Sequence, residues 1–342
     1  MRNIKRTICF LACCILCTAL YAQDLHFSQF FNSPLTTNPA NTGFIPDGDY
    51  RLGINYRNQW SSIMTVPYQT MSAFGDVQLM KNHSDNGWLG LGGVILHDVA
   101  GSGNLTSTKI YGSIAYHQMI GYSSLLSLGF NAGWANKQIN TQNLKFPDQF
   151  DGQFFDSKLP TSAILDRTNT SYLDMQVGMN YAYFPSQKIY INAGFSAWHV
   201  NKPSESFFTD DNGVANTVPI RYIGFLNGSF KVSDQVILNP NIYYTIQQGI
   251  SEAVAGANVH YDLTGSGDYQ LIAGLYYRNQ EAFIPMLGLG VKDYDFSFTY
   301  DATVSSLSNF NQGRGAFEFS LTRQGIINPN GKRVTPCPTF RN

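Results

Sequence analysis

The stretch that decides the fold is Tyr50-Arg51-Leu52-Gly53-Ile54-Asn55-Tyr56-Arg57-Asn58-Gln59-Trp60. Large apolar side chains occupy every second position of its first half, and the positions between them are polar or very small. Successive side chains of a β-strand point to opposite faces, so this alternation predicts a strand with one apolar and one polar face. Near the other end of the chain, Gly315–Thr322 repeats the pattern, with Phe317, Phe319 and Leu321 opposite Glu318, Ser320 and Thr322.

Similar segments fill the sequence between these two strands. The fourteen expected strands are 50–60, 69–79, 87–98, 105–117, 124–137, 170–183, 188–199, 217–231, 235–247, 252–263, 268–278, 281–290, 293–301 and 315–323. Each is about nine residues or longer, which suits a tilted membrane strand, and bacterial outer-membrane barrels have even strand numbers. We therefore predict an all-β fold: a transmembrane, antiparallel, up-and-down β-barrel of about 14 strands over residues 50–323.

The composition agrees with a strand-and-turn protein. Of the 342 residues, 43% are hydrophobic, 14% are aromatic and only 13% are charged, with 24 Phe, 20 Tyr and 31 Gly. Helical bundles and disordered chains have other compositions. After residue 22 there is no run of 18 apolar residues, so a membrane-spanning part must be a barrel.

Residues 1–22 have the pattern of a secretory signal peptide, with a basic start, an apolar run and Ala22 before the expected cleavage site. Lipid attachment at Cys14 is the alternative, although a cysteine stands where the motif needs a small residue. Cleavage leaves a net charge of −4 and the single cysteine Cys337, which excludes an internal disulfide and disfavours nucleic-acid binding.

Connection lengths predict the orientation of the barrel. The three longest connections, 138–169, 200–216 and 302–314, all fall at one end, whereas the turns at the opposite end are short. Outer-membrane barrels have short periplasmic turns and long outer loops. We therefore expect both termini in the periplasm of a Gram-negative bacterium, including a tail of residues 324–342.

A soluble β-sandwich is the alternative fold, since its strands also alternate apolar and polar residues. A sandwich of this length would need several domains, and no linker interrupts the strands between residues 50 and 323. Aromatic residues crowd the strand ends, as at Tyr50, Trp60 and Trp134, which is typical of the girdles of a membrane barrel.

No motif predicts catalysis, a cofactor or a metal site. His97-Asp98 ends a strand without a nucleophile nearby in sequence, and Asp210-Asp211-Asn212-Gly213 lacks the later ligands of a calcium loop. Gly90, Gly92 and Gly93 lie within a strand and are interpreted as small lumen-facing or kink positions.

Residues 23–49 precede the strands and have a different character. Prolines 34 and 39 block regular pairing, while aromatic side chains require burial. We predict a plug or cap segment in the lumen or at its periplasmic mouth; a collapsed leader is the alternative. The candidate plug or partner contacts in it are His26, Phe27, Gln29, Phe30 and Phe31.

Several of these stretches resemble one known family. They are His26-Phe27-Ser28-Gln29-Phe30, Ser33-Pro34-Leu35, Asn38-Pro39-Ala40, Thr42-Gly43, the strand from Tyr50 to Trp60, Tyr300-Asp301, and Gly315-Ala316-Phe317-Glu318. In these the chain resembles the PorP/SprF family, outer-membrane barrels of the Bacteroidota type IX secretion system. The resemblance implies a role in secretion, surface attachment or gliding. It also implies partners: other type IX components and a secreted cargo with a type B C-terminal domain.

We therefore expect a non-enzymatic barrel that binds or anchors cargo at the cell surface. The longest loop carries the expected partner contacts, Phe146, Phe150, Phe154 and Phe155. Aromatic side chains of this kind can bury in a protein partner. A porin or substrate-selective channel is the alternative function, and an outer-membrane hydrolase is a third, for which no residue cluster can be assembled.

Overall fold

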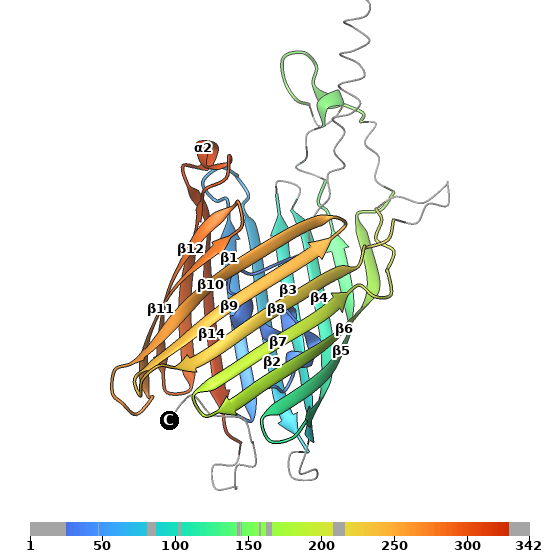
Figure 1. Ribbon diagram of the computed structural model, residues 1–342. Coiled ribbons are helices and arrows are strands. Elements are labelled where there is room, and N and C mark those ends of the chain that lie inside the picture. Colours follow the sequence, from blue (N-terminus) through green and yellow to red (C-terminus); the bar gives the residue numbers. More distant parts are fainter. Residues whose placement is uncertain are drawn as a thin grey trace, which may run out of the picture.

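The computed structural model is a closed barrel of antiparallel strands (Figure 1). It describes residues 25–46, 48–80, 87–101, 104–141, 144, 146–156, 159–161, 166–207 and 216–327. In this part the strands are β1 (Tyr50–Gln59), β2 (Tyr68–Leu79), β3 (Gly87–Ala100), β4 (Leu105–Met119), β5 (Ser124–Gln138), β6 (Asn169–Ser186), β7 (Ile189–Trp198), β8 (Arg221–Lys231), β9 (Val236–Gln247), β10 (Ile250–Asp262), β11 (Tyr269–Arg278), β12 (Ala282–Val291), β13 (Tyr294–Thr303) and β14 (Arg314–Gly325). The predicted fourteen-stranded barrel is confirmed. The expected signal peptide and most of the expected tail, with Cys337, lie outside the described residues.

The barrel closes where the first strand meets the last. Each strand pairs with its neighbours in the chain, and β1 pairs with both β2 and β14. At this seam Tyr50 lies opposite Gly325, and Gln59 lies opposite Ala316. Closure leaves no sheet edge with unpaired backbone groups, which is the condition for a strand structure inside a membrane.

The orientation of the side chains excludes the sandwich. Leu52 and Ile54, on the apolar face of β1, are 51% and 55% exposed on the outside of the barrel. Asn55 and Arg57, on the polar face, are buried inside it. An outward apolar surface around a polar interior is the arrangement of a barrel in lipid.

The strand boundaries follow the sequence closely. β8 differs most, because it begins at Arg221 and not at residue 217. Pro219 lies just before it and has no N–H to donate to a sheet ladder. The carbonyl of Pro219 instead accepts a hydrogen bond from the Gln247 side chain (3.2 Å).

The two ends of the barrel differ in their connections. The links from β5 to β6, from β7 to β8 and from β13 to β14 all lie at one end, here called the long-loop end. The last of these contains α2 (Ser308–Asn311), which stands at the top of Figure 1. The opposite end, where β1 begins and β14 ends, is the short-turn end. No helix in the described residues is long and apolar enough to cross a membrane.

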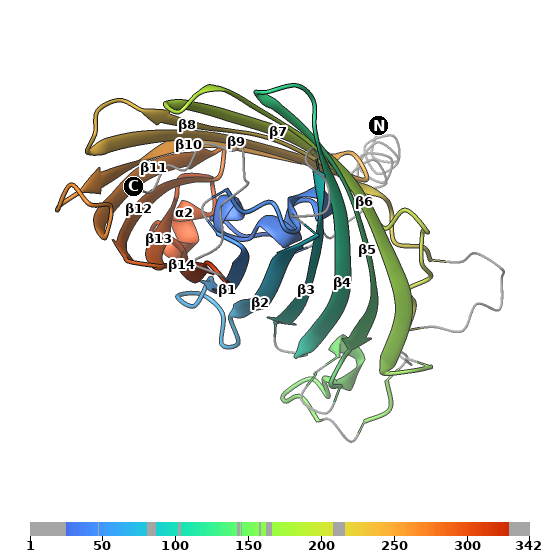
Figure 2. The same cartoon turned by 90° about the horizontal axis from the view of Figure 1, so that it is seen from below.

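Residues 25–46, here called the lumen segment, lie inside the barrel (Figure 2). They form three short 3-10 turns, η1 (Phe30–Asn32), η2 (Pro34–Thr36) and η3 (Pro39–Asn41). Proline begins η2 and η3, because its fixed φ suits a first helical position and its missing N–H is not needed there. The Asn38 side chain caps η3 by accepting a hydrogen bond from Ala40 N (2.8 Å).

Candidate functional site

Four charged side chains from four strands meet inside the barrel, and we call them the charge cluster. They are Arg57 of β1, Arg278 of β11, Asp301 of β13 and Glu318 of β14, each at most 2% exposed. Asp301 Oδ2 lies 2.8 Å from Arg57 Nη2 and 3.0 Å from Arg278 Nη1. Arg57 Nη1 also lies 3.3 Å from Glu318 Oε2. Within the cluster two cations face two anions, and Arg278 Nε also lies 3.5 Å from Oε1 of the buried Glu252, so each buried charge has an opposite charge beside it.

The lumen segment binds this cluster through Ser28 and Gln29. The two oxygens of Glu318 accept the backbone N–H groups of Ser28 (2.8 Å) and Gln29 (2.9 Å). The Ser28 hydroxyl contacts three cluster members: it lies 3.0 Å from Asp301 Oδ1, 2.5 Å from Arg57 Nη1 and 2.6 Å from Arg278 Nη2. Hydrogen bonds to ionised groups are about twice as strong as neutral ones, so this contact holds the segment to the wall.

The five predicted contacts of the lumen segment all lie close to wall residues. His26 Nε2 is 3.5 Å from Glu252 Oε2, and Gln29 is fully buried. The three aromatic side chains pack on apolar wall residues: Phe27 with Phe74 and Leu96, Phe30 with Tyr243 (ring centroids 5.0 Å apart), and Phe31 with Tyr276 (5.2 Å). All five side chains therefore contact the inner wall of the barrel.

Glycines of the wall make room for the second half of the segment. A Cβ at Gly178 of β6 would overlap the Asn38 side chain, and one at Gly129 of β5 would overlap the backbone of Pro39. Gly90 of β3 likewise lies against the carbonyl of Thr42. The interpretation of Gly90 as a lumen-facing position is therefore correct, and its function is close backbone contact.

Hydrogen bonds attach the end of the segment near the short-turn end. The Trp88 indole N–H donates to the carbonyl of Gly43 (2.9 Å), and His117 Nε2 lies 2.8 Å from the carbonyl of Thr42. Gly43 N donates a hydrogen bond to Asp76 Oδ2 (2.7 Å), and the same oxygen accepts one from Arg51 Nη2 (2.8 Å). Each wall group satisfies a backbone group that has left water.

The segment therefore runs along the lumen from one end toward the other. Its start is held by Arg221, the first residue of β8, whose Nη1 donates to the carbonyl of Leu25 (2.8 Å). Its continuation reaches the short-turn end, where Asp49 N donates to Gly325 O (2.7 Å). Leu25 thus lies toward the long-loop end, whereas Ile327 lies at the short-turn end.

The four phenylalanines expected to contact partners lie elsewhere, in the loop between β5 and β6. Phe150 and Phe155 pair through an isolated β-bridge, with ring centroids 5.1 Å apart, and Phe154 at the tip is 72% exposed. The backbone N–H groups of Phe154 (2.6 Å) and Gln153 (2.7 Å) donate to the Asp151 carboxylate, which lowers its pKa.

Other residues of the same loop order its base. Phe146 is half-buried, beside the 3-10 turn η4 (Pro147–Gln149). The Gln149 side chain donates to the carbonyl of Leu159 (3.0 Å). The loop thus displays three exposed aromatic side chains on a locally ordered hairpin.

The His97-Asp98 pair does not form a dyad. His97 faces outward and its Nδ1 lies 2.9 Å from Thr108 Oγ1, whereas Asp98 faces inward and accepts from Thr70 Oγ1 (2.6 Å). Among the described residues, no group of three His, Cys, Asp or Glu side chains is placed to hold a metal ion.

The structure also contains a buried hydrogen-bonded group of three side chains that the sequence did not predict. Asp174 accepts from the Tyr111 hydroxyl (2.6 Å) and lies 2.8 Å from His199 Nδ1, and the Asp and His are fully buried. Its members come from β4, β6 and the residue after β7, so strand pairing and not closeness in the sequence brings them together. The charge cluster was missed for the same reason, although inward positions with charged side chains were visible in the strand pattern.

Comparison with known proteins identifies this architecture. The model of the family described as "Type IX secretion system membrane protein PorP/SprF" matches residues 19–322. The chain belongs to the PorP/SprF family. No curated protein sequence matches it.

Solved structures resemble this PorP/SprF chain in fold. The Pseudomonas putida toluene transporter TodX has a TM-score of 0.51 and 10% identity, over 85% of this chain and 92% of that one. The monoaromatic hydrocarbon channel CymD has a TM-score of 0.50 and 10% identity, over 86% and 93%. At this identity the similarity describes the barrel alone.

Proposed function

We propose that this PorP/SprF barrel binds or anchors a secreted protein at the cell surface through its long-loop end. The observation that carries the proposal is the exposed aromatic hairpin around Phe154, beside a lumen that the chain's own segment traverses. Exposed aromatic side chains supply much of the binding energy of protein interfaces. The partners in this proposal are those that the family resemblance implies, a cargo with a type B C-terminal domain and other secretion components.

In this proposal the lumen segment acts as a plug. It contacts the wall at both ends and in the middle, through the charge cluster, the glycines and Trp88. The long-loop end faces the outside and the short-turn end faces the periplasm, following the usual arrangement of bacterial barrels. Cargo then docks on the surface of the barrel and does not pass through it.

Surface attachment of the cargo tests the proposal. We expect Phe154→Ser to lower the amount of cargo held on intact cells at least fivefold, because it removes the most exposed aromatic side chain of the hairpin. Tyr122→Ser is the matched control, since Tyr122 is fully exposed in the turn between β4 and β5 at the opposite end. Equal attachment by both variants and the unaltered protein, at equal barrel levels, contradicts a docking role for this hairpin.

A channel is the second candidate function, favoured by the fold shared with TodX and CymD. It requires a continuous path past the lumen segment. A large, steady conductance of the intact protein in planar bilayers, not increased by deletion of residues 25–46, favours the channel over the plug.

A further inference from the structure

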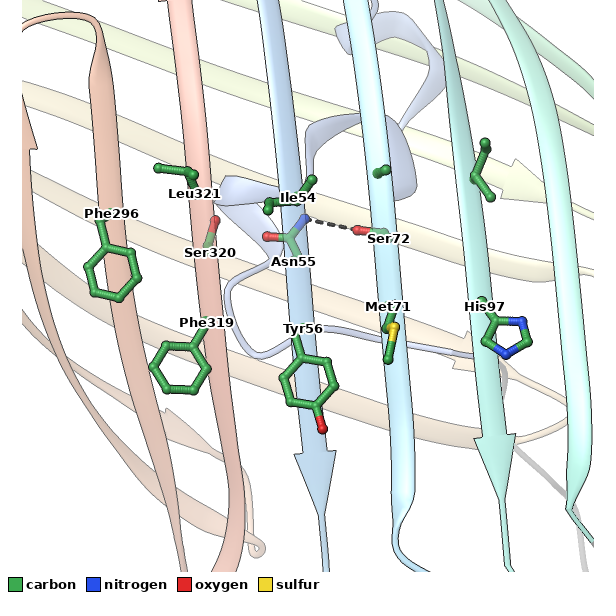
Figure 3. A pocket seen from close by; sticks show the side chains of 12 residues that line it. Ile54, Asn55, Tyr56, Met71, Ser72, His97, Phe296, Phe319, Ser320 and Leu321 are labelled. Atoms are coloured by element: carbon green, nitrogen blue, oxygen red, sulfur yellow. Dashed lines mark hydrogen bonds between the residues drawn. The ribbon is translucent and has the colours of Figure 1, made fainter.

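The lipid-facing surface around the seam is hollowed into a groove of about 470 Å³ (Figure 3). Its sides are two adjacent rows of directly paired residues: Phe296, Leu321, Ile54, Ala73 and Ile95 in one row, and Phe319, Tyr56, Met71 and His97 in the other. Behind them the Asn55 and Ser72 side chains hydrogen-bond to each other (2.9 Å) on the inner face, as Figure 3 shows. The volume lies within the range of small-molecule sites, about 300–1,000 Å³.

A cation stands next to this apolar groove. Arg323 follows Leu321 by two residues on β14, so it shares the outward face and lies one row closer to the short-turn end. Its guanidinium carbon lies 5.1 Å from the ring centroid of Tyr294 and 5.9 Å from that of Tyr50. Gly325 leaves space for the Tyr50 ring, which a Cβ at that position would overlap.

The guanidinium of Arg323 has no anionic partner in the described part of the chain. Its Nε is buried without a hydrogen-bond partner, and its contacts there are the two tyrosine rings. A charge on a lipid-facing surface is costly unless water or a counter-charge reaches it. Arginine pairs with phosphate through two parallel N–H donors, and tyrosines commonly lie at the level of the lipid headgroups.

We propose that this surface binds one phospholipid of the membrane leaflet at the short-turn end. The headgroup phosphate pairs with Arg323 between Tyr50 and Tyr294, and one acyl chain lies in the groove. The occupant is a phospholipid and not free phosphate, because the groove beside the guanidinium is apolar and faces the bilayer. The site does not depend on the cargo or on the plug.

Lipid retention tests the site. The full-length protein is purified from outer membranes in a mild non-ionic detergent, and native mass spectrometry counts the phospholipids retained. We expect one retained phospholipid in the unaltered protein and at least a fivefold loss in Arg323→Gln and in Ala73→Leu, which fills the groove. The controls are Arg314→Gln at the other end of β14 and Ala273→Leu, an outward position on β11; both should retain the lipid.

Several results overturn the proposal. These are equal retention in all variants, equal loss in the controls, or displacement of the lipid by millimolar inorganic phosphate as readily as by added phospholipid. If Arg323→Gln yields no folded barrel, Ala73→Leu decides alone, because it leaves the cation and both tyrosines in place. Loss in Ala73→Leu then supports the site, and unchanged retention overturns it.

Discussion

Replacing Glu318 by glutamine should loosen the lumen segment without changing the shape of the wall. Glu318 accepts two consecutive backbone N–H groups, from Ser28 and Gln29, one on each carboxylate oxygen. In Glu318→Gln one of those N–H groups must face an amide NH₂, and Arg57 loses one of its two anionic neighbours.

The magnitude follows from these contacts. A hydrogen bond to a charged group contributes about 1.5–3 kcal/mol, and an unsatisfied buried donor costs about 1–3 kcal/mol. We therefore expect docking of the segment to weaken by about 2–4 kcal/mol. Since 1.4 kcal/mol is a factor of ten, the ratio of undocked to docked segment should rise about 30- to 700-fold.

Planar-bilayer recording measures this as the fraction of time in which the barrel conducts. Glu281→Gln is the matched control, because Glu281 also pairs with an arginine of the cluster (Arg278, 3.1 Å) but is much more exposed. Deletion of residues 25–46 gives the reference for an empty lumen. If folded Glu318→Gln conducts no more often than the control, while the deletion conducts freely, Glu318 does not hold the segment.

Three further predictions concern the wall, the membrane face and the orientation. Gly178→Ala should displace the segment and raise conductance, because its Cβ overlaps Asn38, whereas Gly224→Ala, with open space around it, should not; equal conductance refutes the close fit. Leu287→Arg should reduce the yield of inserted barrel, because Leu287 is 62% exposed in the middle of β12 and an arginine at the bilayer midplane costs about 2–4 kcal/mol. The control Leu287→Phe keeps an apolar side chain there and should insert normally. Phe154→Cys should react with a membrane-impermeant maleimide on intact cells and Tyr122→Cys only after permeabilisation; the reverse pattern inverts the proposed orientation.

The wall of this barrel is predictable from the sequence because its signal is local. The two-residue alternation around Ile54 and Phe319 identifies both the strands and their faces. Strands in a membrane must form a closed barrel, because no other arrangement of strands pairs all their backbone groups. The largest difference between an expected and an observed boundary is at the start of β8, where Pro219 has no N–H to donate to the sheet.

The contacts inside the lumen, in contrast, join residues that lie far apart in the sequence. Arg57, Arg278, Asp301 and Glu318 come from four strands, and their meeting depends on how the tilted strands close around the interior. Alternation predicts that each side chain points inward but not which of the others it meets. The path of the lumen segment is equally hard to predict from the sequence, because its three short 3-10 turns leave no periodic pattern of apolar residues.

The lumen segment and the wall are matched over the whole length of their contact, which bears on the plug proposal. Ser28 hydrogen-bonds to charged groups of the wall, and the backbone around Pro39 lies against wall glycines. The indole N–H of Trp88 donates to the carbonyl of Gly43. A leader that had merely collapsed into the lumen would not require glycines at Gly129 and Gly178, where any side chain would overlap it. Buried polar networks are stable only when nearly all their members are satisfied, so removal of the segment would leave the charge cluster short of partners. The interior of the wall is thus complementary to this segment, and a displaced segment is a higher-energy state that the barrel reaches only when something compensates the lost contacts.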